Sequence, residues 1–583
     1  MILQALVQHY ENLDRQGLVA KPGWCHAKVS YAIELQEDGG IRGIIPLKHE
    51  EERGSKKVWI SETLCVPEMI TRSSSGVAAN FLCDNAKYFL GIEKSGTNKR
   101  VIECFNAARE KHLEFLENAE GTMAEAICRY FEKWQPEHAL ENDAVREHWQ
   151  ELNEGGNLIF CMRSDYAQDD EEIKRIWEEK LNQAEKGKIG VCLVTGKKTE
   201  IARIHRRIKG VPGAQSSGAA LVSFNASAFE SYGKEQSYNG PVGKYAEYAY
   251  TTALNYLLNQ REYACKIGDS MVVSWAESAD MEYQKAFLLS IDPQPDNQEE
   301  LKKLFGNLDK NIWVDINDMK LNPDQKFYIL GIAPNAARLS VRFFYENTFG
   351  NVIRNIARHY KRMAIVKPAW VNNDYLGIDK MLYATVNTNA NNKTPVPNMA
   401  AMVLRAILSD MPYPTSLYTD TLIRIRADCG DVTYGHAAII KAFLIKNYKW
   451  KEGDQYMALN EECTDSAYVL GRLFAVLEAI QTDANPGINS TIRERYFNAA
   501  CATPATVFPV LIKLKNSHIK KLDRESTAAK IYYEKQLTDI MGKIAISDTA
   551  SGFPKTLSLE NQGKFMLGYY HQTQKKYEKK ENR

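Results

Sequence analysis

AKVSYAIEL at residues 27–35 and GIRGIIPL at residues 40–47 decide the fold of the amino-terminal region. Both stretches are short and alternate apolar with polar residues, which is the pattern of β-strands that bury one face. Gly39 and Gly40 lie between them, as expected for the turn of a β-hairpin. The strand pattern extends from Trp24 to about Trp59, and a β-containing amino-terminal domain is predicted to begin here.

Outward from this hairpin, the chain alternates between helical and strand patterns. Residues 99–190 predict helices, and KIGVCLVTG at 188–196 predicts a buried strand followed by a basic, Gly-rich loop. Residues 245–260 return to a helical pattern, and FYILGIAP at 327–334 predicts a strand that enters a long helix. From residue 399 onward the pattern is almost entirely helical.

The length of 583 residues exceeds what one hydrophobic core organises, so several domains are expected. The polar, Asn- and Pro-rich stretch at residues 387–399 predicts a linker. Residues 281–325 are polar and acidic and are expected to include a surface connection. We therefore expect a mixed α/β multidomain protein, with an α+β amino-terminal platform and a carboxy-terminal α-helical bundle.

Charge and cysteine content limit the function. The formal net charge of +1 argues against a protein that coats nucleic acid indiscriminately, so any nucleic-acid binding must be local. The first residues predict an amphipathic helix and not a signal peptide, and no apolar run is long enough to span a bilayer, so we expect a cytoplasmic protein. The 11 cysteines are scattered singly without a CxxC pair, so we expect reduced thiols and no metal site.

No enzyme motif fits at the required spacing. HExxH, GxSxG, GxGxxG and kinase motifs are absent from the sequence. The stretch from Gly190 to Thr199 differs from a phosphate-binding loop by one extra residue between the glycines and by a second Lys in place of Thr. Carboxylate pairs do not stand out from charged helix faces. We therefore expect no catalytic residue and no cofactor.

The strongest local signal for nucleic-acid binding is the basic segment at residues 186–209. It contains eight cations and one acid, Glu200, and is followed by the polar loop GVPGAQSSG at 210–218. Lys and Arg would neutralise phosphates there, while loop side chains and backbone N–H groups approach a groove. The alternative is a solvated basic loop. The candidate DNA-binding residues are Lys197, Lys198, Arg203, Arg206, Arg207, Lys209, Gln215, Ser216 and Ser217, and Lys186 and Lys188 complete the cations.

A second candidate is the segment TRSSSG at residues 71–76 with the block that follows it. An Arg among small hydroxyl residues can enter a minor groove and read its width and base-edge acceptors, which suits a short motif. An ordinary capped turn beside core aromatic residues explains the same pattern. The candidate residues are Thr71, Arg72, Ser73, Ser74, Asn80, Asn85 and Lys87.

A third candidate is the helix predicted after residue 348. Arg354, Arg358 and Arg362 recur at every fourth position on one face, opposite an apolar stripe. Such a ridge would track phosphates, with Arg354 and Arg358 as the candidate DNA-binding residues. Salt bridges to neighbouring parts of the protein are the equal alternative.

Three long blocks are specific to one protein family. They are NFLCDNAKYFLG at 80–91, the segment at 213–258 that begins GAQSSGAALVSFN, and PNAARLSVRFFYENTFG at 334–350. Through these blocks the chain resembles the type I-C Cascade large subunit of CRISPR surveillance complexes. The resemblance extends from the amino-terminal helix through Arg424–Asp428 and so covers nearly the whole chain. One departure is Ala79, where Pro is expected in the family.

The resemblance implies a non-catalytic subunit of an RNA-guided complex in antiviral defence. The guide RNA reads the target by base pairing, while this subunit recognises a protospacer-adjacent motif in double-stranded DNA, promotes unwinding and R-loop formation, and helps recruit a helicase-nuclease. The implied partners are double-stranded target DNA, the guide RNA (crRNA) ribonucleoprotein, the backbone, small and crRNA-processing subunits, and the helicase-nuclease, with no membrane. Two alternatives are a structural scaffold without motif reading and a metal-dependent nuclease.

The resemblance also implies three parts: an α/β domain at 1–385 for duplex and motif recognition, a linker and helical connection at 386–456, and a helical bundle at 457–583 that resembles the small subunit. In this family the last part is also made separately and holds displaced DNA, which fits the basic tail at 575–583. Met457 is expected to begin a helical segment and is a candidate internal start, because Lys451-Glu452-Gly453 can be encoded as a ribosome-binding site. An ordinary internal Met is the alternative.

Overall fold

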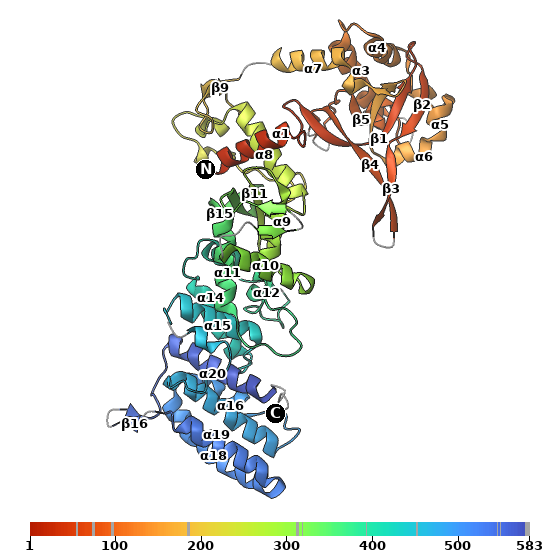
Figure 1. Ribbon diagram of the computed structural model, residues 1–583. Helices are drawn as coiled ribbons and strands as arrows, with labels where there is room; N and C mark the ends of the chain where they lie inside the picture. Colours follow the sequence, from red (N-terminus) through yellow and green to blue (C-terminus); the bar gives the residue numbers. More distant parts are fainter. Residues whose placement is uncertain are drawn as a thin grey trace. The chain divides into compact units, whose positions relative to one another are not determined.

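The chain folds into two compact units. Unit 1 comprises Leu3–Arg206 and Val222–Tyr256, and unit 2 comprises Arg207–Leu221 and Leu257–Arg583. The computed structural model (Figure 1) describes residues 1–53, 56–70, 72, 76–94, 98–183, 187–309, 314–316, 319–391, 393–450, 453–544, 546–547 and 550–577.

In the described part of unit 1, seven strands form one sheet in the order β3-β4-β1-β6-β5, with β2 on β1 and β7 on β6. β1 (Trp24–Leu35) pairs antiparallel with β2 (Ile41–Pro46), so the hairpin predicted around Gly39 is confirmed. The other strands are β3 (Lys48–Arg53), β4 (Lys56–Pro67), β5 (Cys83–Asn85), β6 (Asn157–Met162) and β7 (Asp165–Tyr166).

One face of this sheet is covered by helices. Residues of α2 (Ala86–Phe89), α3 (Lys99–Leu116), α4 (Thr122–Lys133), α5 (Asp143–Glu147), α6 (Trp149–Glu154) and α7 (Glu171–Gln183) share one apolar cluster with the sheet. The other helices of unit 1, α1 (Ile2–Arg15) and α8 (Lys244–Asn259), have no described residue in this cluster. Phe105 of α3 and Phe160 of β6 both pack against Phe131 of α4, with ring centroids 5.8 and 5.7 Å from it. The helical prediction for residues 99–190 is thus largely confirmed, but it missed β6, which pairs parallel with β1 at the centre of the sheet.

The buried strand predicted at residues 188–196 is wrong. β8 (Ile189–Val191) is short and pairs only with β9 (Lys198–Glu200), and the side chains of Ile189, Val191 and Leu193 are exposed. The chain turns at Cys192, whose thiol accepts the N–H groups of Val194 and Thr195 at 3.4 Å. This turn ends the strand after three residues and leaves only the cysteine buried.

Unit 2 begins with a four-stranded antiparallel sheet, β10-β11-β14-β15. Its strands are β10 (Ala264–Ile267), β11 (Ser270–Ala276), β14 (Lys326–Asn335) and β15 (Arg338–Thr348). The strand predicted at 327–334 is present, but it turns through Ala336 into β15 before the long helix α11 (Phe349–Met363) begins. Residues 281–325 contain α9 (Met281–Ile291) and α10 (Gln298–Asp309), which the polar composition did not reveal.

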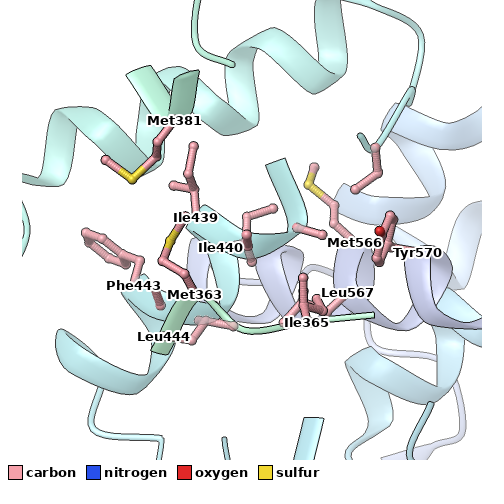
Figure 2. Packing of buried hydrophobic residues seen from close by; sticks show 14 of the residues in the cluster. Met363, Ile365, Met381, Ile439, Ile440, Phe443, Leu444, Met566, Leu567 and Tyr570 are labelled. Atoms are coloured by element: carbon pink, nitrogen blue, oxygen red, sulfur yellow. The ribbon is translucent and has the colours of Figure 1, made fainter. Parts of the chain in front are cut away.

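After α11, unit 2 consists of helices packed around one apolar cluster, apart from the short strand pair β16 (Ile546–Ser547) and β17 (Ala550–Ser551). Figure 2 shows side chains of this cluster from three helices, among them Met363 of α11, Ile440 of α15 and Met566 of α20. The helices are α12 (Ile378–Tyr383), α13 (Met399–Leu408), α14 (Thr415–Ala427), α15 (Tyr434–Lys446), α16 (Ser466–Ala484), α17 (Ile492–Ala502), α18 (Pro504–Glu525), α19 (Thr527–Met541) and α20 (Leu559–Tyr577). The expected mixed α/β fold with carboxy-terminal helices is confirmed.

Two details of the carboxy-terminal half differ from expectation or add to it. Met457 does not begin a helix: it follows a short 3-10 turn, and α16 starts at Ser466. Residues 387–391 and 393–398 are irregular, and buried residues of α12 and α13, on either side of them, belong to the same apolar cluster. The three-part division of the chain remains a prediction.

Candidate nucleic-acid interface

The segment predicted to enter a minor groove is built around one buried carboxylate, that of Asp84. The Arg72 guanidinium forms a two-pronged ion pair with it, with one bond of 2.9 Å, and stacks on the Tyr88 ring at 3.8 Å. The backbone N–H groups of Asn80 and Asn85 donate to the same carboxylate at 2.8 Å each. Arg72 is therefore held inside the protein, and its assignment as a DNA contact remains a prediction.

The neighbouring candidates also have structural partners. Asn80 is buried, and its amide oxygen accepts the Ile70 N–H at 2.8 Å. Asn85 caps α2 through the Lys87 N–H at 3.1 Å, which is the capped turn weighed as an alternative. The Lys87 ammonium pairs with Glu93 at the surface. Thr71, Ser73 and Ser74 lie outside the described residues.

Three cations of the basic segment are exposed and free of ion pairs in the described part of the chain. Lys197 lies in the β8–β9 turn, Lys198 begins β9, and Arg203 follows that strand. Glu200, the one acid in the segment, pairs instead with Lys244 of α8. Lys197, Lys198 and Arg203 are thus available to phosphates. Lys186 lies outside the described residues, and Lys188 covers the Tyr238 ring at 4.8 Å.

Arg206 is engaged within unit 1. Its guanidinium donates to Glu68 at 2.8 and 3.1 Å and to Glu247 at 2.6 Å, and its N–H also donates to Glu247. It lies over the Tyr248 ring at 4.7 Å. Glu247 is almost completely buried, and this burial raises its pKa in spite of the adjacent guanidinium. Arg206 therefore compensates a buried acid and is a poor phosphate contact.

The polar loop at residues 207–221 belongs to unit 2 and is closed by backbone hydrogen bonds. Ile208 and Ala219 exchange two N–H to carbonyl bonds of 2.8 and 2.9 Å, which close its neck. Ala220 bonds to Ala337 and Leu339 beside β15. Gly218 has a φ of +92°, and a Cβ there would lie 2.8 Å from the Ile208 carbonyl oxygen, so glycine is required.

This closed neck presents an exposed polar tip. Gln215, Ser216 and Ser217 are all exposed. The Arg207 guanidinium crosses the loop and donates to the Gly218 carbonyl at 3.0 Å and to the Gln215 amide oxygen at 3.5 Å. Lys209 is exposed on the same loop. The arrangement is a preorganised loop whose tip can donate to and accept from base edges.

The arginine ridge of α11 is partly a salt-bridge network. Arg362 and Lys446 bind Asp410 at 2.9 Å each, and Arg358 approaches it at 3.7 Å. Burial would raise the pKa of Asp410, but hydrogen bonds from Lys446 and Arg362 outweigh it and hold the pKa below its usual range. The Arg354 guanidinium donates to the Gly350 carbonyl at 3.1 Å. Arg358 is the member whose side chain is largely exposed.

A cationic stripe on α18 was not found from the sequence. Lys513, Ser517, Lys520 and Arg524 are all exposed and lie at spacings of four, three and four residues, so they share one helix face. Within the described residues the three cations form no ion pair. The segment LKNSHIKKLDRE at residues 514–525 carries this pattern, whereas the prediction of a displaced-strand contact rested on the basic tail at 575–583. Of that tail, the structure describes residues 575–577.

The described residues offer neither a metal cluster nor a membrane-spanning helix. No group of three or more His, Cys, Asp or Glu side chains is placed there to hold a metal ion. None of the helices, as far as they are described, has the length and apolar character needed to cross a bilayer. What the geometry offers is exposed cations and a polar loop, which are the groups that contact phosphates and base edges.

Comparison with protein families agrees with the resemblance inferred from the blocks at 80–91, 213–258 and 334–350. The model of the CRISPR-associated protein family Cas_Csd1 matches residues 6–577. The chain belongs to the Cas_Csd1 family. The resemblance to the type I-C Cascade large subunit is thereby confirmed, and this Cas_Csd1 protein is a CRISPR-associated Cascade large subunit. A search of curated proteins found no match to it.

Proposed function

We propose that this Cas_Csd1 protein recognises the protospacer-adjacent motif in double-stranded DNA, promotes unwinding and R-loop formation, helps recruit the helicase-nuclease, and catalyses no reaction. The observation that carries the proposal is the loop at 207–221. Its neck is fixed by backbone pairing while its tip residues Gln215, Ser216 and Ser217 stay exposed. A protein that recognises a short DNA motif needs such a rigid loop with exposed polar side chains.

The tip and the exposed cations have different roles in this proposal. A Gln amide can bond to adenine through two atoms, and a Ser hydroxyl can donate to or accept from any base, so the tip supplies selectivity. Lys197, Lys198 and Arg203 contact phosphates and supply affinity without selectivity. Arg206 and Arg72 support the fold, because each compensates a buried carboxylate.

The carboxy-terminal helices are proposed to hold the displaced strand. The α18 stripe places cations over a twelve-residue stretch of helix, from Lys513 to Arg524, with a rise of about 16 Å between the first and the last. A row of cations on one helix face, without ion pairs among the described residues, suits a flexible single strand better than a fixed groove. Separate translation from Met457 is part of this proposal. A Met457→Leu change should remove a short product detected with a carboxy-terminal tag, and persistence of that product would exclude this start.

The test is DNA binding by the assembled RNA-guided complex. Target duplexes carry a correct or a scrambled adjacent motif, and affinities are measured across a salt series. A Lys197/Lys198/Arg203→Ala variant should bind both duplexes more weakly, with a log-log salt slope shallower by about 3 if each cation contacts one phosphate. The matched control is Lys266/Lys303/Lys380→Ala, which removes three exposed cations without ion pairs in the described residues. It should bind as wild type does.

A second variant tests selectivity. Gln215/Ser216/Ser217→Ala should reduce discrimination between the two motifs and leave the salt slope unchanged, because no phosphate contact is removed. A wild-type complex that binds correct and scrambled motifs equally would refute motif recognition. The protein would then be a structural scaffold of the complex, and DNA binding by the complex would be the same for the wild type and the variants. A Lys513/Lys520→Ala variant should make thymines of the displaced strand more reactive to permanganate. Without these two lysines the strand would no longer be held against α18, and its bases would be exposed to the reagent.

A further inference from the structure

A cleft of about 390 Å³ opens in unit 2 between α16, α19 and α20. Its lining includes three small side chains, those of Ala475 and Ala479 of α16 and Ala529 of α19. Tyr532 of α19 stands at its rim with 54% of its surface exposed. A cavity of this size, with small apolar and aromatic side chains in its lining, is large enough for a small planar ligand.

The acids of the cleft are already compensated. Glu478 accepts hydrogen bonds from the hydroxyls of Tyr569 and Thr491, both at 2.7 Å. Asp483 accepts one from the Tyr533 hydroxyl. A cationic ligand would therefore have to displace internal partners. Arg493, which also lines the cleft, is paired with Glu478 and Glu494, so a neutral ligand fits the cleft better than a charged one.

The cleft retains free hydrogen-bonding groups on its walls. Gln572 of α20 is only 8% exposed, and its amide oxygen accepts from Arg472 at 3.1 Å. Within the described residues, its Nε2 has no acceptor. Gln536 of α19 makes no side-chain hydrogen bond in the same part of the chain. A purely apolar occupant would bury these amides without partners, which costs about 1–3 kcal/mol for each group.

We propose that this cleft binds one unstacked nucleobase. A base is planar and uncharged, so it can stack on Tyr532, and its edge carries donors and acceptors for the two amides. This inference rests on the proposed function, because the nucleobase would come from the displaced single strand. A free mononucleotide presents the same chemistry, and the experiment separates the two sources.

The experiment measures binding of the full chain to a short single-stranded DNA and to an abasic strand of equal length. Tyr532→Ala should weaken binding to the base-bearing strand about tenfold, with an unchanged salt slope, and should not affect the abasic strand. Tyr383→Ala is the matched control, because Tyr383 is another exposed tyrosine of unit 2. It should leave both affinities unchanged.

Ala529→Phe supplies a second variant, because it fills the cleft without removing a wall group. Its affinities for the base-bearing and the abasic strand should equal those of Tyr532→Ala. In the mononucleotide arm, 2-aminopurine deoxynucleoside monophosphate should lose fluorescence on stacking with the wild type and keep it with Ala529→Phe.

Failure of the two proposals is distinguishable. If the wild type binds neither strand but quenches 2-aminopurine, the cleft takes a base and the displaced-strand source is wrong. Equal binding of both strands and no effect of either variant, with no quenching, overturns the nucleobase proposal. If Ala529→Phe blocks assembly with other subunits while nucleotide binding is unchanged, the cleft holds a partner's side chain and the proposal is wrong.

Discussion

Removal of the Asp84 charge tests whether the Arg72 pair holds the amino-terminal sheet together. Asp84 is completely buried, whereas the Arg72 side chain is 20% exposed. In Asp84→Asn, the guanidinium loses a charged partner, and two backbone N–H groups compete for one amide oxygen. Breaking a buried ion pair costs about 3–5 kcal/mol, and the partial exposure of Arg72 favours the lower end, about 3 kcal/mol.

Hydrogen exchange measured by mass spectrometry reports this loss locally. β5 contains Asp84 and pairs with β6, so peptides covering Asn157–Met162 should exchange about a hundredfold faster in the variant. Glu93→Gln is the control, because it breaks the exposed Lys87–Glu93 pair in the same segment and should cost under about 1 kcal/mol. If the two variants exchange at the same rate, the buried pair contributes nothing beyond a surface pair, and the structural role assigned to Arg72 is wrong.

Three further changes probe other parts of the fold. Arg206→Ala should destabilise unit 1 by about 2–3 kcal/mol in urea unfolding because it leaves Glu247 buried without a counter-charge; a cost under about 0.5 kcal/mol would contradict this. His112 is buried with a pKa lowered to about 3, so the unfolded chain alone binds this proton between about pH 6.5 and 3, and stability falls as the pH drops through that window. His112→Gln should remove about 2 kcal/mol of the loss between pH 7 and 5, and an unchanged pH profile would refute the assignment. Gly471→Ala places a methyl group against the Phe565 carbonyl and should push α16 away from α20. The free energy of unfolding should fall by about 1–3 kcal/mol, which a lower midpoint of thermal unfolding would show.

The features predicted correctly from the sequence are those with a local periodicity. The hairpin around Gly39 alternates with period two, and the carboxy-terminal helices repeat every three to four residues, so each pattern reveals the buried face directly. β6 was missed because NLIFCM is buried on both faces of the sheet and shows no alternation. The apolar run at 188–196 misled in the opposite sense, because the turn at Cys192 keeps its side chains at the surface.

The candidate site was less predictable because charge partners are distant in sequence. Arg206 and Glu247 are separated by 41 positions, so no count of local charges reveals that they pair. The same applies to Arg362, whose partner Asp410 lies on a later loop. The cationic stripe of α18 was hidden for another reason: its lysines fit the helical pattern, and their exposure became evident only when the buried face of the helix was known.

The distinction between paired and free cations predicts which residues determine the affinity for DNA and which determine motif selectivity. A phosphate that approaches Arg206 must displace two carboxylates, one of them buried, whereas Lys197 is exposed and has no ion pair to displace among the described residues. Affinity should therefore depend on the free cations of unit 1, and motif selectivity on the loop tip at 215–217 in unit 2. Because these groups belong to different units, changes at one should alter the salt slope and changes at the other should alter discrimination. A variant of the loop tip that changed both would show that the same side chains contact phosphates and bases.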